Sequence, residues 1–184
     1  MEVSPRKLEG SFSILLKNIP DHRGFFMRSY DKQIFQRHGL ALDWLYENHS
    51  LSIKKGTIRG LHFQLPPYSE AKLVRCIRGA MLDVFLDLRK DSPTFGQWDA
   101  VELSAENQLS VFIPRGFAHG FCTLTDDCEV LYKVDNLYRP DYEGGIHWDD
   151  PTLNFPWKKI DPILSEKDSK LPSWNDFLQQ IGGL

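Results

Sequence analysis

Short apolar runs separated by turn residues fill the middle of the chain. The turn signals are Lys55-Gly56, Pro66-Pro67, Arg78-Gly79 and Ser92-Pro93, and residues of this kind divide successive strands. Many short strands at a spacing of roughly 8–12 residues are typical of β-sandwiches and jelly rolls. The pattern therefore predicts a mainly β chain of this type, with strands over 46–53, 57–64, 72–78, 80–88, 97–103, 110–114, 118–123 and 128–135.

The two ends of the chain have other patterns. Residues 11–18 and 25–30 are expected strands on either side of a turn at 21–24. Residues 31–38 are an expected helix with Asp31 as its N-cap, and Gly39 would end it.

The tail carries two expected short helices, over 165–170 and 174–181, and Ser173 is placed to cap the second. No linker or repeat interrupts the chain. We therefore expect one domain over residues 1–184, with a short helical cover at its C-terminal end.

Composition narrows the classes of protein. Hydrophobic residues are 41%, charged residues 26%, and the formal net charge is -3, so no general attraction to nucleic acid or anionic membranes is expected. The N-terminus has no apolar signal region, and no apolar run approaches the ~18 residues that a membrane span needs. Cys76, Cys122 and Cys128 lack metal-ligand spacing and are an odd number, which favours buried thiols in the cytoplasm.

Candidate chemistry begins in the segment Arg59-Gly60-Leu61-His62-Phe63-Gln64. Strict strand alternation would place Arg59 with Leu61 and Phe63, and His62 on the opposite, more polar face. His62 lies beside a glycine that leaves room. A histidine that only forms hydrogen bonds inside the core fits this pattern as well.

Other candidates have ordinary structural interpretations when taken singly. Lys72 precedes an apolar strand and would pass for a solvated lysine. His119 lies with Gly116 and Gly120 in an apolar strand, which indicates close approach by a ligand or another chain. Tyr132 and Tyr138 would usually be packing residues.

Several linked motifs, taken together, change this assessment. Their residues are Asp21-His22-Arg23-Gly24-Phe25-Phe26, Asn48-His49-Ser50, Gly56 to Gln64, Lys72-Leu73-Val74, Asp87-Leu88-Arg89, Ser92-Pro93-Thr94, Gly116 to Phe121, and Trp148-Asp149-Asp150-Pro151. In order and spacing, they resemble the dTDP-4-dehydrorhamnose 3,5-epimerase family. The resemblance runs from about Asp21 to Asp168, which is most of the chain.

The resemblance implies a cupin-type jelly roll and a homodimer that exchanges N-terminal strands. It also implies catalysis without a metal or redox cofactor, on a nucleotide-diphosphate sugar in rhamnose-type deoxysugar and cell-surface polysaccharide biosynthesis. His62 matches the general base, Asp168 its orienting carboxylate, Lys72 the enolate stabiliser and Tyr132 the acid on the opposite face. The implied substrate-binding positions are Arg23, Phe26, Arg28, Tyr46, Asn48, Arg59, His119 and Tyr138.

The residue types suit this chemistry on their own terms. A ketone at C4 of a sugar acidifies the protons at C3 and C5, and removal of one leaves an enolate that needs a cationic or hydrogen-bonding partner. Histidine, with a reference pKa of roughly 6.5, suits the base. Inversion of C3, C5 or both then requires an acid that returns the proton from the other face.

Two positions depart from the family pattern. Arg28 stands where the family has glutamate, and Tyr46 stands where it has glutamine. Arginine has only donors, so it cannot accept the N3–H of thymine, whereas cytosine offers an acceptor at N3. A CDP-linked substrate is therefore an alternative to a dTDP-linked one, and Arg28 contacting phosphate or solvent is another.

Three further functions compete with the epimerase interpretation. A metal-binding cupin could use His62 and His119, although no His-x-His pair or carboxylate ligand is evident. A 3,4-ketoisomerase shares the fold. A non-catalytic sugar-nucleotide binding protein would not need the full set of acid, base and oxyanion residues.

Overall fold

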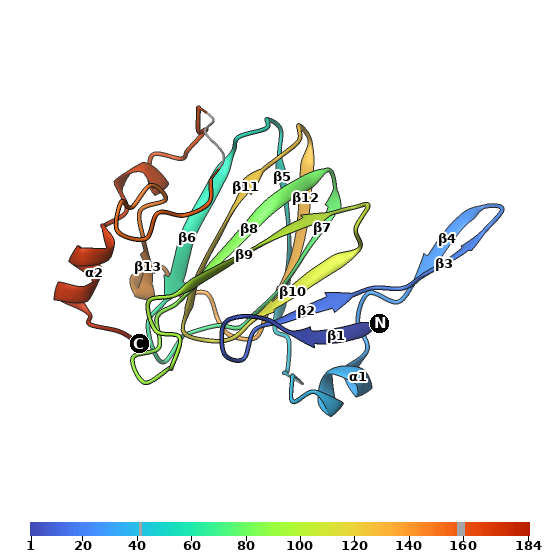
Figure 1. Cartoon of the computed structure of the whole chain (residues 1–184), viewed down its shortest axis with the longest axis horizontal. Helices are drawn as coiled ribbons and strands as arrows, with labels where there is room; N and C mark the ends of the chain where they lie inside the picture. The colour runs from blue at the N-terminus through green and yellow to red at the C-terminus, as the bar shows by residue number, and fades with distance from the viewer. Residues whose placement is uncertain (41, 158–160) are drawn as a thin grey trace.

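Two antiparallel sheets that face each other form the centre of the computed structural model, which describes residues 1–40, 42–157 and 161–184 (Figure 1). This sandwich confirms the predicted fold class. The six-stranded sheet has the order β1 (Glu2–Pro5), β2 (Phe12–Leu15), β10 (Leu109–Ile113), β7 (Lys72–Arg78), β12 (Cys128–Val134) and β5 (Tyr46–Ser52). The five-stranded sheet has the order β13 (Glu143–Gly145), β6 (Ile58–Gln64), β11 (Phe117–Thr123), β8 (Ala80–Asp87) and β9 (Trp98–Ser104).

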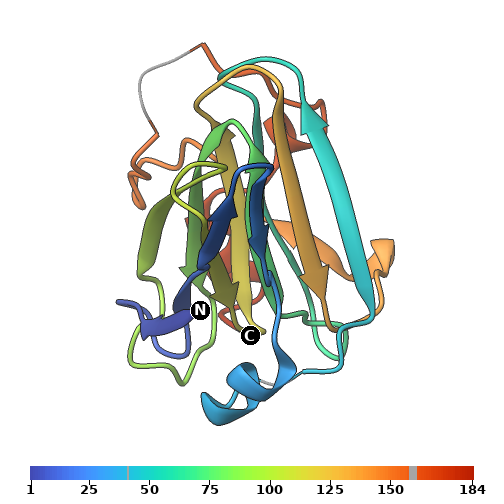
Figure 2. The same ribbon diagram turned by 90° about the vertical axis from the view of Figure 1, so that its right-hand side faces the viewer.

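The space between the sheets is filled by side chains from alternate strand positions. Val74 and Val130 enter it from the six-stranded sheet, and Phe85 and Phe121 enter it from the other; all four are at most 5% exposed. β5 lies beside β12 at the edge of the six-stranded sheet (cyan and orange in Figure 2). Residues of β5, β12 and β7 therefore share one wall of the sandwich, opposite β6 and β11.

The C-terminal segment covers the outer face of the five-stranded sheet (red in Figure 1). The helix α2 (Trp174–Gln180) presents Phe177 to Phe63, with ring centroids 5.6 Å apart. Ser173 caps this helix and forms a capping box with Asp176, which confirms the predicted cap. The expected helix at 165–170 is a shorter 3-10 helix, η2 (Asp168–Lys170), and another short one is η1 (Pro140–Tyr142).

The helix α1 (Lys32–Arg37) covers part of the outer face of the six-stranded sheet. The Asp31 side chain accepts hydrogen bonds from the amides of Gln33 and Ile34, as predicted for an N-cap. Phe35 is fully buried in a cluster with Ile14 and Phe112. This cover ties the N-terminal part of the chain to the sandwich.

The N-terminal strands differ from their prediction. The expected strand 11–18 divides into β2 and β3 (Asn18–Asp21), and the expected strand 25–30 is only β4 (Gly24–Met27). β3 and β4 pair with each other and form a hairpin that projects from the body (Figure 1). The chain has to leave the sheet after Leu15 to build this hairpin, and apolar periodicity does not record that exit.

Two strands were not predicted at all. β1 pairs with β2 at a sheet edge, where Pro5 is tolerated because an edge residue needs no second ladder partner. β13 is three residues, Glu143-Gly144-Gly145, that pair with β6. Neither segment has the branched or aromatic composition that indicates a strand.

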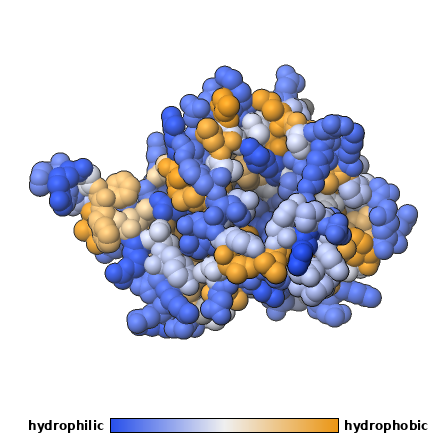
Figure 3. Space-filling model, turned by 180° about the vertical axis from the view of Figure 1, so that it is seen from behind, coloured by the Kyte–Doolittle hydropathy of each residue, from blue (hydrophilic) through white to orange (hydrophobic). Residues whose placement is uncertain are grey.

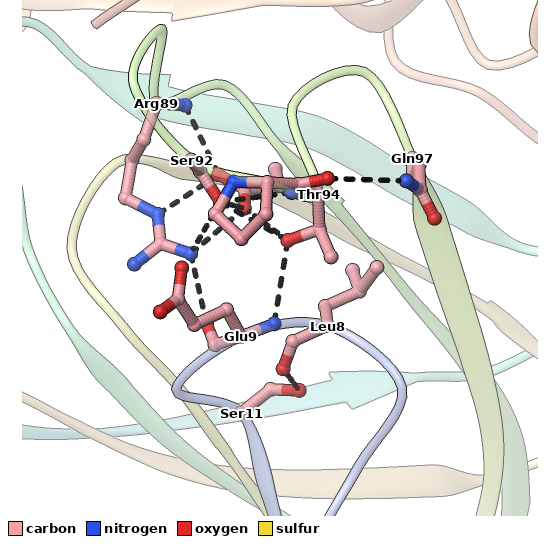
Figure 4. A network of polar contacts seen from close by, with 9 residues as sticks. Leu8, Glu9, Ser11, Arg89, Ser92, Thr94 and Gln97 are labelled. Carbon is pink, nitrogen blue, oxygen red and sulfur yellow. Dashed lines mark hydrogen bonds and ion pairs between the residues drawn. The ribbon is translucent and has the colours of Figure 1, made fainter.

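The motif residues Asp87, Arg89, Ser92 and Thr94 form a structural network rather than part of the cavity described below. Figure 4 labels Arg89, Ser92 and Thr94 of this network. Asp87 is fully buried and accepts hydrogen bonds of 2.6–2.7 Å from the other three side chains. Burial alone would raise the pKa of Asp87, but these hydrogen bonds outweigh it and lower the pKa. Arg89 and Thr94 also form hydrogen bonds with the Glu9 backbone, and these bonds hold the turn between β1 and β2 against the sandwich.

Candidate active site

Two adjoining cavities of about 450 and 420 Å³ open between the sheets. Both are lined by His62, Lys72 and Tyr132, which are the three lining residues that the two cavities have in common. His62 comes from β6, whereas Lys72 and Tyr132 come from β7 and β12 of the facing sheet. Residues far apart in the sequence therefore meet at the junction of the two cavities.

His62 forms a close pair with Asp168. Its Nε2 lies 2.6 Å from Asp168 Oδ1, and the side chains are 28% and 6% exposed. Burial would raise the pKa of Asp168, but hydrogen bonds from His62 and the Gly60 amide outweigh it and lower the pKa. A charged carboxylate on Nε2 fixes the imidazole and leaves Nδ1 as the nitrogen that can receive a proton from a ligand.

Arg59 lies on the same side of β6 as His62, which corrects the alternation predicted from the sequence. Both residues line the larger cavity, whereas Leu61 and Phe63 pack beneath α2. The reason is a register shift between β6 and β11. His62 is paired with His119 and Arg59 with Phe121, so β6 has one more residue than β11 between the two pairs. The extra residue in β6 is a bulge that turns Arg59 inward.

The glycines beside the two histidines have a different role from the one predicted. A Cβ at Gly60 would lie 2.6 Å from the His119 carbonyl oxygen, and one at Gly120 would lie 2.7 Å from the Arg59 carbonyl oxygen. The close approach is thus between β6 and β11 of this chain, rather than by a ligand or another chain. It brings the two histidines opposite each other on neighbouring strands.

His119 forms the second histidine–carboxylate pair at the cavity. Its Nε2 lies 2.7 Å from Oδ2 of Asp83, which is fully buried on β8. The other carboxylate oxygen, Oδ1, is buried without a hydrogen-bond partner. His119 is the one side chain paired to this carboxylate in the hydrogen bonds found for the described residues, so the pair holds its ring in place.

Tyr132 and Lys72 lie in the wall opposite His62. Lys72 is 9% exposed and its Nζ lies 3.2 Å from Glu70 Oε1. Burial, followed by the Glu70 carboxylate, raises the pKa of Tyr132. Tyr132 is consequently a neutral phenol near pH 7, which is the form that can donate a proton.

The smaller cavity is lined by the predicted binding residues Tyr46, Asn48 and Tyr138. Asn48 is the register partner of Tyr132 across β5 and β12. The Tyr138 hydroxyl donates a 2.7 Å hydrogen bond to Glu143, and this bond raises the pKa of Tyr138 to about 12.

Comparison with known proteins identifies the family. The dTDP-4-dehydrorhamnose 3,5-epimerase family model matches residues 5–176. The chain belongs to this family. A curated relative of that name from Shigella flexneri is 50% identical over 149 residues, covering 80% of this chain and 82% of the relative. The sequence-based assignment to the family, and with it to a class of isomerases, is confirmed.

Solved structures of epimerases from this family have the same fold. The Bacillus anthracis dTDP-4-dehydrorhamnose 3,5-epimerase, with TDP and PPi bound, has a TM-score of 0.91 and 44% identity, covering 94% of this chain and 98% of its own. The Legionella pneumophila epimerase, in complex with dTDP-4-keto-L-rhamnose, has a TM-score of 0.89 and 36% identity. It covers 95% of this chain and 93% of its own.

Arg23, Phe26 and Arg28 are not in the cavities of the chain that carries them. They lie on or beside the projecting hairpin, with Arg23 paired to Asp21 and Arg28 Nη1 3.1 Å from Asp31. Their side chains are not among the lining residues of either cavity.

Several cavity residues were missed by the sequence reasoning. Glu70 and Glu143 line the smaller cavity, and Lys167 lines the larger one, with its Nζ 2.6 Å from Glu143. The partner of His119, Asp83, could have been found from the sequence, because a carboxylate inside an apolar strand requires a hydrogen-bonding or charged partner. The two glutamates lie in irregular or very short segments, and their sequence context did not indicate a place in the cavity.

The described part of the chain was also compared with the metal-binding alternative. Among residues 1–40, 42–157 and 161–184, no three His, Cys, Asp or Glu side chains are grouped to hold a metal ion, as a metal-binding cupin would need. Within the same ranges, none of the helices has the length and apolar character to cross a membrane. All three cysteines are buried, as expected.

Proposed function

We propose that the protein epimerises C3 and C5 of a dTDP-linked 4-keto-6-deoxyhexose, in deoxysugar biosynthesis of the rhamnose type. The observation that carries this proposal is the placement of His62 and Tyr132 on opposite sheets, at one cavity junction. A sugar ring between them would present one face to a base and the other to an acid. That arrangement inverts a carbon, whereas a base alone would only exchange its proton.

Each side chain has a distinct task in the proposed reaction. His62, oriented by Asp168, removes the proton next to the C4 ketone. The electron pair moves onto the C4 oxygen, where the Lys72 ammonium stabilises the enolate charge. Tyr132 gives its hydroxyl proton to the carbon from the opposite side, the enolate electron pair forms the new C–H bond, and the C4 ketone returns with the neighbouring carbon inverted. The His62 imidazolium then loses its proton to solvent and the Tyr132 phenolate takes one up before the next turnover.

A carbonyl-position assay distinguishes this reaction from that of a 3,4-ketoisomerase. With dTDP-4-keto-6-deoxyglucose as substrate, we expect ¹³C NMR to show that the ketone of the product remains at C4, with C3 and C5 inverted. A product with its ketone at C3 would contradict the proposal. Loss of activity after dialysis against a chelator, restored by a metal ion, would instead support a metal-dependent cupin.

We propose dTDP as the carrier, and we base this on the relatives rather than on the base pocket. The CDP alternative rests on Arg28, and in this chain the Arg28 guanidinium is already paired with Asp31. We expect calorimetric titration to show dTDP binding at least tenfold more tightly than CDP, about 1.4 kcal/mol. Tighter CDP binding, reversed in Arg28→Glu, would favour the alternative.

We also propose a homodimer in which the hairpin supplies residues to the neighbouring copy. Ile19, Phe25 and Phe26 on the hairpin are 59%, 58% and 63% exposed. Figure 3 shows this apolar surface on a projecting arm that ends in a polar tip. Exposed apolar area of this size on a two-stranded ribbon is best explained by burial against a partner, because such a ribbon is marginal alone.

The dimer is tested by sedimentation on dilution. We expect Phe25→Ser/Phe26→Ser to weaken the dimer, since each buried Phe contributes about 1.5–3 kcal/mol, or roughly tenfold to hundredfold in Kd. Activity should fall with the dimer, because Arg23 would no longer reach a cavity. Leu178→Ser, on α2 and 37% exposed, is the matched control. An active monomer would contradict the proposed exchange.

A cytoplasmic setting is part of the proposal. The Cys76 and Cys128 sulfurs lie 3.8 Å apart, well beyond the ~2.05 Å of a disulfide. Adjacent buried thiols suit a reducing compartment, where disulfides are rare.

A further inference from the structure

Glu70 is a carboxylate inside the site that neither the base nor the acid of the proposed mechanism uses. It precedes β7 and its side chain is 13% exposed. Its Oε1 lies 3.2 Å from Lys72 Nζ, and its Oε2 accepts a 3.0 Å hydrogen bond from Gln64 Nε2. Both oxygens are therefore occupied, and one of them holds the ammonium that faces the cavity junction.

Gln64 keeps this carboxylate from turning away. It is 3% exposed at the end of β6. Its amide nitrogen shares two hydrogens among Glu70 and the carbonyl oxygens of Tyr68 and Leu137, which lie 3.0 and 3.1 Å away, and its oxygen accepts a 2.6 Å hydrogen bond from the Arg139 amide. A fully engaged amide presents Glu70 to Lys72 in one orientation.

The same carboxylate acts on Tyr132. After burial, Glu70 is the largest cause of the raised pKa of this phenol, and Glu143 adds to it. Arg59 and the Asn48 side chain act in the opposite direction. The other titratable groups that line the two cavities are Tyr46 on β5, His62 on β6, Lys72 on β7, His119 on β11, Tyr138, Lys167 and Asp168 in η2.

We propose that Glu70 is a positioning residue of the active site, whose carboxylate fixes the Lys72 ammonium at the wall of the cavity that Tyr132 also lines. Without its negative charge, Lys72 would be a buried cation with no carboxylate to hold it, and it would be free to turn from the enolate oxygen. The Tyr132 phenolate would also form more readily. This inference rests on the proposed roles of Lys72 and Tyr132.

The test uses Glu70→Gln, which keeps the shape of the side chain and removes its charge. We expect kcat to fall about tenfold with KM changed less than about twofold, because the enolate partner is misplaced while binding contacts remain. We also expect the phenolate absorbance of Tyr132, taken as the difference from the matched Tyr132→Phe protein, to appear at lower pH than in the unmodified protein. Glu70→Asp should retain the pH midpoint of that absorbance but lose kcat, because it keeps the charge and shortens the reach.

Glu129→Gln is the control, since Glu129 is on β12 but pairs with His49 outside both cavities. It should leave kcat and the Tyr132 midpoint unchanged. An unchanged Tyr132 midpoint in folded Glu70→Gln, or an unchanged kcat, would overturn the proposal. The optical titration does not require catalysis, so it tests Glu70 independently of the proposed function. The proposed function is contradicted by a different result, namely normal epimerisation by Lys72→Ala or Tyr132→Phe.

Discussion

Replacement of His62 by alanine should abolish hydrogen exchange at C5 of the sugar while leaving the protein folded. His62 is the histidine that lines both cavities among the described residues, and its partner carboxylate, Asp168, lies in η2. The loss of a general base is worth roughly 10²–10⁴-fold in rate. Exchange is measured by ¹H NMR of dTDP-4-keto-6-deoxyglucose in deuterated water, and folding by circular dichroism.

Two variants calibrate this result. Asp168→Asn should retain weaker exchange, because the imidazole remains but its orientation and charge support are reduced. His49→Ala is the control, since His49 pairs with Glu129 away from both cavities. Near-normal exchange in folded His62→Ala would remove His62 from the mechanism.

Tyr132→Phe should separate proton removal from inversion. His62 and Lys72 are untouched in this variant, so abstraction and exchange at C5 should continue. Phenylalanine cannot donate a proton to the opposite face of the sugar, so we expect epimerised product to form roughly a hundredfold more slowly. The measurement compares deuterium content with stereochemistry at C5 in the same NMR sample.

Tyr30→Phe is the matched control, because Tyr30 packs against Phe35 in the outer cluster. It should be fully active. If Tyr132→Phe inverts C5 at the normal rate and shows only lower thermal stability, Tyr132 is a packing residue of β12 and another group is the acid.

Strand periodicity predicted the sandwich well because most strands of the middle of the chain alternate inward and outward side chains. The pattern correctly predicted the strands that carry Lys72 and Tyr132, and the structure shows that these strands belong to the same sheet. The pattern was wrong about Arg59, because the bulge in β6 depends on the partner strand β11 rather than on local composition. The roles of Gly60 and Gly120 were misjudged for the same reason, since their neighbour is a strand more than fifty positions away.

The candidate site shows a second limit of sequence reasoning. His62, Lys72 and Tyr132 could be selected because their residue types fit enolate chemistry and their motifs resemble a family. Glu70 and Glu143 could not, because each is an ordinary surface-type residue until the fold places it in the cavity. The hairpin is different, because the resemblance to the family implies exchanged N-terminal strands, although apolar periodicity alone does not show that Arg23 and Phe26 leave the body of their own chain.

The most direct test of the account follows the unmodified protein with dTDP-4-keto-6-deoxyglucose in deuterated water by NMR. The account predicts deuterium at both C3 and C5, with both centres inverted and the ketone still at C4. Deuterium at these carbons without inversion would contradict the two-faced site formed by His62 and Tyr132, and absence of deuterium from both carbons would contradict the proposed reaction itself.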